Sequence, residues 1–105
     1  MHARVTMFEI DTLRIGLNDA LERFRATVLP AARNREGYEG IYVLRTPEGK
    51  GLIMSLWATQ EAAAAGVESG YYDEQVSRFV SVFRSPPGRE HYEVAYAEPP
   101  RSPTG

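Results

Sequence analysis

The side chain best suited to acid–base chemistry is His91, near the carboxyl end of the sequence. It precedes Glu93 by two positions, so both side chains project from one face if this segment is a β-strand. A histidine titrates near neutral pH, and beside a carboxylate it can serve as a general base. The alternative is a solvated strand residue without a catalytic role.

Trp57 is the only tryptophan of the chain and stands near the end of an apolar stretch, residues 51–58. In a strand, Trp57 and Ser55 share one face. Because a tryptophan side chain buries a large area, one interpretation is core packing. The other is that Trp57 forms the wall of a small-molecule pocket, with Ser55 also contacting the ligand.

Six tyrosines are present in only 105 residues. Tyr72 and Phe79 lie on one face of a helical pattern that spans residues 71–83. The phenolic hydroxyl of Tyr72 could hydrogen-bond a phenolic substrate, and Phe79 could contact its ring. Packing at a subunit interface is the alternative use of these tyrosines.

Composition excludes several other kinds of chemistry. Without cysteine the chain has no disulfide, thiolate nucleophile or cysteine metal site. Its two histidines lack a third ligand at a recognisable spacing, and no G-x-S-x-G or phosphate-binding glycine loop occurs. A net charge of −2 argues against a nucleic-acid partner. No apolar run approaches the roughly 20 residues of a membrane span, and no signal peptide is recognisable. We therefore expect a cytoplasmic protein.

The spacing of apolar residues predicts the strands and helices that would position these residues. Period-two patterns predict strands at residues 2–10, 38–46, 51–58 and 89–97, with a hairpin turn at residues 47–50. Asp11 or Thr12 is expected to cap a helix over residues 13–34, with Leu17, Phe24 and Val28 on its apolar stripe. Thr59 is the expected cap of a second helical region.

The predicted order is β-α-β-β-α-β, which is typical of a ferredoxin-like α+β fold with a four-stranded antiparallel sheet and helices on one face. Residues 1–98 are expected to form one domain, and residues 99–105 a proline-rich tail without core potential. The third strand is apolar on both faces, with Leu52, Met54 and Leu56 on one of them. Since helices cover only one face, we expect a two-fold homodimer to cover the other.

Three segments carry a resemblance to a known family: "VLPAARNREGYEGIYVL", "LIMSLWATQEA" and "PPGREHYEVAYA". Together they resemble the antibiotic biosynthesis monooxygenase-like family of the dimeric α+β barrel superfamily. The matching features are a helix that ends in "LPAAR", a turn flanked by Gly37 and Gly40, and "LW" followed by T-x-E-A. None of them is a catalytic signature.

The resemblance implies a homodimer with a pocket between the sheet and the helices of each subunit. Members include cofactor-free oxygenases of polycyclic phenols and haem-degrading enzymes. In the oxygenases a tryptophan near the end of the third strand lines the pocket, and it corresponds to Trp57 here. The asparagine of those pockets has no counterpart in the first strand, where Arg4, Thr6 and Phe8 stand. The haem-degrading members use a histidine on the second helical segment, and residues 59–83 contain none.

These observations predict a cofactor-independent monooxygenase-like protein for a small aromatic or phenolic molecule. Trp57 would be the pocket wall, Tyr72 the hydroxyl donor and His91 the base, and no cofactor is expected. One alternative is a ligand-binding or stress-response protein without enzymatic activity. Another is haem binding through a different ligand, for which His91 would be the candidate.

Overall fold

The computed structural model describes residues 1–68, 88–98 and 100. Within this part of the chain the elements follow in the order β1 (His2–Glu9), α1 (Leu17–Arg33), β2 (Tyr38–Arg45), β3 (Lys50–Trp57), α2 (Gln60–Glu68) and β4 (Gly88–Glu93). This is the predicted β-α-β-β-α-β order. The helical pattern of residues 71–83 lies outside the described residues.

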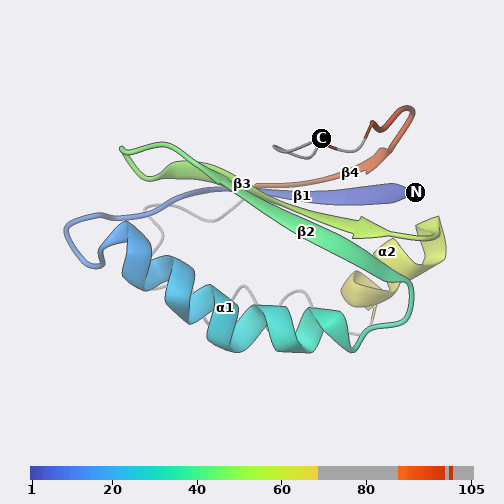
Figure 1. Cartoon of the computed structure of the whole chain (residues 1–105), viewed down its shortest axis with the longest axis horizontal. Coiled ribbons are helices and arrows are strands. Elements are labelled where there is room, and N and C mark those ends of the chain that lie inside the picture. Colours follow the sequence, from blue (N-terminus) through green and yellow to red (C-terminus); the bar gives the residue numbers. More distant parts are fainter. Residues whose placement is uncertain (69–87, 99, 101–105) are drawn as a thin grey trace.

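The four strands form one antiparallel sheet in the order β2-β3-β1-β4. The first strand therefore lies between the third and the last. Both described helices lie on the same side of the sheet, α1 against β2 and α2 against β1 and β3 (Figure 1). This arrangement confirms the predicted ferredoxin-like α+β fold.

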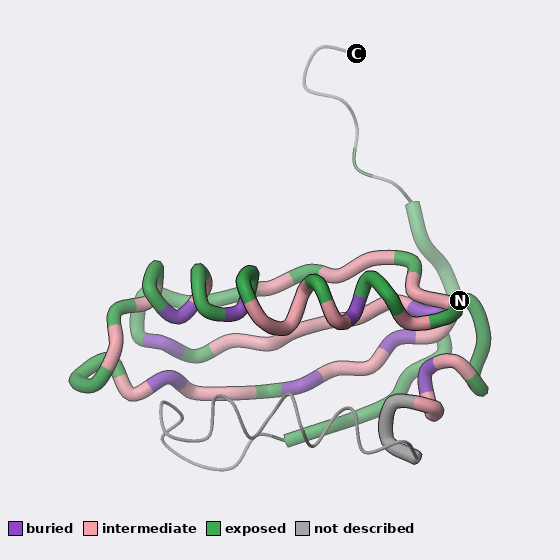
Figure 2. The backbone as a smooth tube through the Cα atoms, turned by 90° about the horizontal axis from the view of Figure 1, so that it is seen from below, coloured by how far each residue is buried: buried purple, intermediate pink, exposed green. Residues whose placement is uncertain are grey.

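A hydrophobic core fills the space between α1 and the sheet. Phe24 in the middle of α1 is only 6% exposed and forms the core with Ile10 and Ala20. The predicted helical stripe is confirmed, because Leu17 and Val28 pack against the same cluster. The buried positions of α1 lie along the side that faces the sheet (Figure 2). From the strands, the side chains that complete this core are Phe8, Ile41, Val43 and Ile53.

Helix α1 begins four residues later than the sequence pattern predicts. Gly16 occupies its N-cap position and makes no side-chain capping bond. Asp11 instead closes a turn, since its Oδ1 accepts the N–H of Leu13 at 3.1 Å and its carbonyl accepts the N–H of Arg14 at 2.9 Å. The prediction that Asp11 or Thr12 caps the helix was wrong, because an aspartate can stabilise a turn as readily as a helix start.

Helix α2 packs closely against the turn that precedes β2. Gly37 in this turn has a φ of 83°, a left-handed conformation that favours glycine. A Cβ atom at this position would lie 2.5 Å from the Cβ of Ala62 in α2. The glycine therefore allows α2 to approach the end of the sheet where Trp57 lies.

Strand β4 ends earlier than predicted. The last residue of β4 that pairs with β1 is Glu93, which lies opposite His2. One further hydrogen bond joins the N–H of Val94 to the carbonyl of Met1 at 2.9 Å. Residues 94–97, which the sequence pattern also assigns to this strand, lie beyond its end at Glu93. Tyr96 is 80% exposed.

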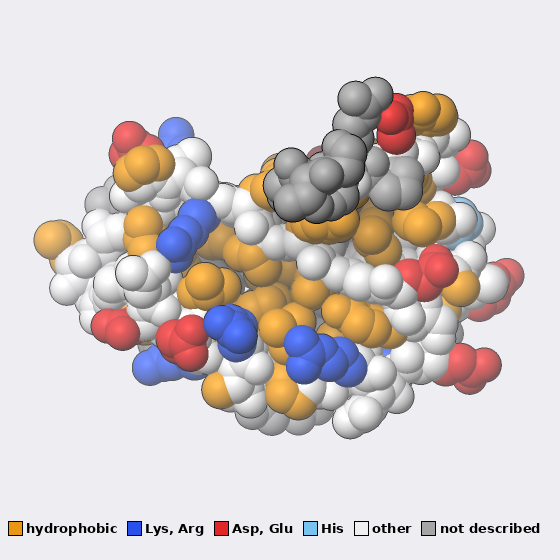
Figure 3. Space-filling view, viewed as in Figure 1, with side chains coloured by type: hydrophobic (Ala, Val, Ile, Leu, Met, Phe, Trp, Pro, Cys, Tyr) orange, Lys and Arg blue, Asp and Glu red, His pale blue; other side chains and the backbone are white. Residues whose placement is uncertain are grey.

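The sheet face turned away from the helices is apolar at its centre, and its charged residues, Glu9, Lys50 and Glu90, lie at a strand end and on the edge strand β4. Met54 lies at its centre, opposite Val5 in β1 and Tyr42 in β2. Tyr42 and Leu44 are each 50% exposed on this face. In the side view of Figure 3, hydrophobic side chains gather along the sheet, above α1. We call this surface the open sheet face; its members are Val5, Met7, Tyr42, Leu44, Leu52, Met54, Leu56 and Tyr92.

No helix within the described ranges is both long and apolar enough to cross a bilayer.

Candidate functional site

Trp57 lies where β3 gives way to α2, on the helix-covered face of the sheet. Its side chain is only 4% exposed. The ring of Tyr38 meets it edge to face, with 5.8 Å between the ring centroids and 72° between the planes. Thr59 caps α2 as predicted, since its Oγ1 accepts the N–H of Ala62 at 3.0 Å. Trp57 is thus fixed between a strand end and a capped helix start.

A hydrogen-bonded chain holds the indole ring in one orientation. Nε1 of Trp57 donates to Oγ of Ser55 at 2.9 Å. Oγ of Ser55 in turn donates to the backbone carbonyl of Arg4 in β1 at 3.4 Å. A serine hydroxyl can accept and donate at once, so Ser55 couples the indole to the neighbouring strand.

His91 lies on the same face, in β4, directly opposite Arg4. Its Nε2 is 3.4 Å from Nδ1 of His2, and the two rings meet edge to face with centroids 5.4 Å apart. Such a contact is a hydrogen bond only when one nitrogen carries a proton and the other does not. The contact therefore disfavours a state with both rings protonated. His2 is itself opposite Trp57 in β3, so it lies between the indole and His91.

The surroundings of His91 lower its pKa from the ordinary value of 6.5. Partial removal of the ring from water is the main cause, and repulsion by the charges of His2 and Arg4 adds to it. At neutral pH the imidazole is consequently unprotonated and able to accept a proton. Across the described residues, no three histidine, aspartate or glutamate side chains come together as they would to hold a metal ion.

The structure places three of the five residues proposed from the sequence on one face. Ser55 contacts Trp57, and His91 lies two strands away across β1. Tyr72 and Phe79 belong to residues 69–87, outside the described part of the chain. Their roles remain predictions.

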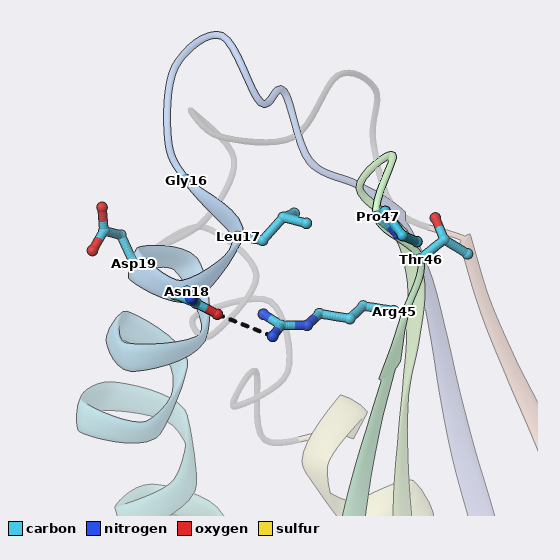
Figure 4. Close-up of a pocket in the computed structure, with 7 residues that line it drawn as sticks. All are labelled: Gly16, Leu17, Asn18, Asp19, Arg45, Thr46 and Pro47. Carbon is cyan, nitrogen blue, oxygen red and sulfur yellow. Dashed lines mark hydrogen bonds between the residues drawn. The ribbon is translucent and has the colours of Figure 1, made fainter.

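A hollow of about 520 Å³ lies at the opposite end of the sheet, between the start of α1 and the β2–β3 turn (Figure 4). Arg45 reaches across it and donates from Nη2 to Oδ1 of Asn18 at 3.0 Å. This hollow is separate from the Trp57 end of the sheet. Its lining consists of Gly16, Leu17, Asn18, Asp19, Arg45, Thr46 and Pro47.

Two residues that the sequence reasoning did not select take part in the site. Arg4 lies between Ser55 and His91, and His2 lies between Trp57 and His91. Period-two alternation does place Arg4 on one face of the first strand, but it does not say which residue of the last strand lies opposite. That pairing depends on the strand register, which needs the folded sheet.

Comparison with known proteins identifies the fold and not a family. No protein-family model matches the sequence, and no curated protein matches it. Solved structures do match over nearly the whole chain. A protein of unknown function from Nitrosomonas europaea superposes with a TM-score of 0.71 at 21% identity, covering 96% of this chain and 95% of the other.

Two oxygenase structures have the same architecture. SnoaB from Streptomyces nogalater, a cofactor-independent oxygenase solved in a mutant form, gives a TM-score of 0.72 at 11% identity and covers 94% and 97% of the two chains. The ActVA-Orf6 monooxygenase of Streptomyces coelicolor, in complex with nanaomycin D, gives 0.70 at 14% identity, covering 95% and 92%. The chain therefore has the fold that the sequence resemblance implied. At these identities the likeness concerns the fold alone.

Proposed function

We propose that this protein is a cofactor-independent monooxygenase of a small, electron-rich aromatic molecule. The observation that carries the proposal is a face of the sheet that carries both a fixed indole, Trp57 in β3, and a neutral histidine, His91 in β4, with β1 between them. Trp57 forms the wall against which the substrate ring packs, and His91 accepts the phenolic proton. Tyr72 is the proposed hydroxyl donor, with Phe79 and Ser55 completing the contacts to the substrate.

The fold supports the same conclusion. It is shared with a cofactor-independent oxygenase and with a monooxygenase bound to nanaomycin D.

In the reaction we propose, the substrate anion itself reduces dioxygen. A ring methylene then becomes a carbonyl: one oxygen atom bonds to the carbon, and the other leaves as water with the two hydrogens. The protein contributes orientation, exclusion of water and the proton acceptor.

We also propose that the protein acts as a homodimer, in which the open sheet face of each subunit packs against that of the other. A cluster of exposed apolar side chains on one sheet face is typical of an interaction site. A two-fold dimer would bury the same surface on both copies, which makes the contact self-complementary.

A ligand-binding role without turnover is the second candidate. It is favoured by the bond between Nε1 of Trp57 and Ser55, because the indole N–H is already used within the protein. Trp57 then offers a ligand only its apolar ring. Binding of an aromatic ligand without oxygen uptake would support this role.

The test of the base is the pH dependence of oxygen uptake with dithranol, an electron-rich phenolic anthrone, after treatment of the protein with a chelator. The value of kcat/KM above the uncatalysed rate is expected to rise with pH through the pKa of His91 and then level off, because only neutral imidazole accepts the proton. His91→Asn is expected to reduce the rate about 100-fold or more and to remove this rise.

The effect of His2 on the pKa of His91 provides an internal control for this assignment. Repulsion by His2 helps to keep the pKa of His91 below 6.5, so His2→Asn should raise that pKa and move the rise to higher pH. Other charged residues of the described face near these rings are Arg4, Arg89 and Glu93. With only two histidines in the chain, NMR titration can follow His91 directly. A wild-type pH profile in His91→Asn would contradict its role as the base.

A further inference from the structure

Arg4 occupies the centre of the candidate site. It lies in β1 with Ser55 opposite it in β3 and His91 opposite it in β4. In a sheet, directly paired residues project from the same face. The side chain of Arg4 is half-buried, and it stands between the indole-holding serine and the proposed base.

The described neighbours of Arg4 on this face are mostly uncharged or basic. The directly paired and same-strand positions are His2, Thr6, Ser55 and His91, none of which is acidic. Among the described diagonal positions of β4, one is basic, Arg89, and one is acidic, Glu93. The charge of Arg4 contributes to the lowered pKa of His91, so its positive field reaches the position where a substrate oxygen would lose its proton.

Loss of that proton leaves an oxyanion that needs a donor. A guanidinium cannot lose its own proton at physiological pH, and it offers five N–H donors in a planar fork. It can therefore bind a ligand oxygen while it keeps other hydrogen bonds within the protein. A hydrogen bond from a cation to an oxyanion is also stronger than one between neutral groups.

We infer that Arg4 binds the negatively charged oxygen of the ligand, and that the ligand is an aromatic molecule bearing an acidic oxygen, such as a phenolate or a carboxylate. The inference rests on the proposed function, because it places the ligand at the site of Trp57 and His91. It adds a recognition residue to that function: a neutral aromatic ring of the same shape would bind less tightly.

The test compares naphthoate with its neutral amide by isothermal titration calorimetry at neutral pH, where naphthoate is ionised. The wild-type protein is expected to bind naphthoate at least about tenfold more tightly than the amide. Arg4→Gln is expected to abolish this preference and leave amide binding unchanged. Arg4→Lys should retain part of it, because the charge remains but the fork does not. Arg45→Gln, at the other end of the sheet, is the matched control and should bind as wild type.

Equal affinity for the two ligands in the wild-type protein would overturn the inference, as would an intact preference in folded Arg4→Gln. If Arg4→Gln does not fold, the test is the salt dependence of binding to the wild-type protein. The affinity for naphthoate must then fall with ionic strength more than the affinity for the amide does. Binding of neither ligand also overturns the inference. The proposed function is judged separately by oxygen uptake with dithranol, so the two can fail independently.

Discussion

Replacing Trp57 by alanine is expected to lower the free energy of unfolding by about 3–5 kcal/mol. The side chain is 4% exposed, its ring packs against Tyr38, and its Nε1 is bonded to Ser55. Truncation removes all three contributions and leaves a cavity where β3 meets α2. Chemical denaturation of the variant and the wild type measures the difference.

Trp57→Phe separates packing from function. Phenylalanine keeps an aromatic ring but not the N–H donor, so the loss of stability should be only about 1–2 kcal/mol. Oxygen uptake should nevertheless fall at least about tenfold, because the substrate ring loses the larger wall. Tyr96→Ala is the control for removal of an exposed aromatic ring; it should change stability by less than about 0.5 kcal/mol. Full turnover in a folded Trp57→Phe protein would contradict the pocket assignment.

Met54→Asp is expected to weaken the proposed homodimer by about 100-fold or more. Met54 lies at the centre of the open sheet face, between Val5 and Tyr42. In a sheet-on-sheet dimer a carboxylate there would be buried without a partner, at a cost of several kcal/mol. Sedimentation velocity or native mass spectrometry over a range of protein concentrations measures the change.

Leu13→Asp is the matched control for this substitution. It adds the same charge at a leucine that is 91% exposed in the segment between β1 and α1, away from the open sheet face. This variant should associate as the wild type does. A wild-type protein that is monomeric at every concentration would contradict the dimer. So would a Met54→Asp variant that remains as tightly associated as the wild type.

The sequence predicts the fold well because its main elements are signalled locally. The hairpin of β2 and β3 follows from two apolar strands and the turn at residues 47–50, and the stripe of Leu17, Phe24 and Val28 identifies the buried face of α1. Alternation in the third strand also separates Met54 from Ser55 and Trp57. These patterns depend on residue spacing alone.

Features that depend on distant residues were not predictable in the same way. Strand β4 ends at Glu93, although the apolar alternation of the sequence continues to Tyr96. The position of Arg4 opposite His91, and the contact of His91 with His2, follow from the register of two strands, and these two pairs of residues are 87 and 89 positions apart in sequence. Register is set by the assembled sheet and its packing, which no single strand encodes.

The most direct test of the proposed function is the origin of the oxygen atom in the product. Chelator-treated protein would convert dithranol under isotopically labelled dioxygen, and mass spectrometry would follow the quinone that forms. We expect turnover above the uncatalysed rate, with one labelled atom in each quinone and the other in water. No acceleration over the protein-free reaction, or a new oxygen atom derived from water, would contradict a cofactor-independent monooxygenase.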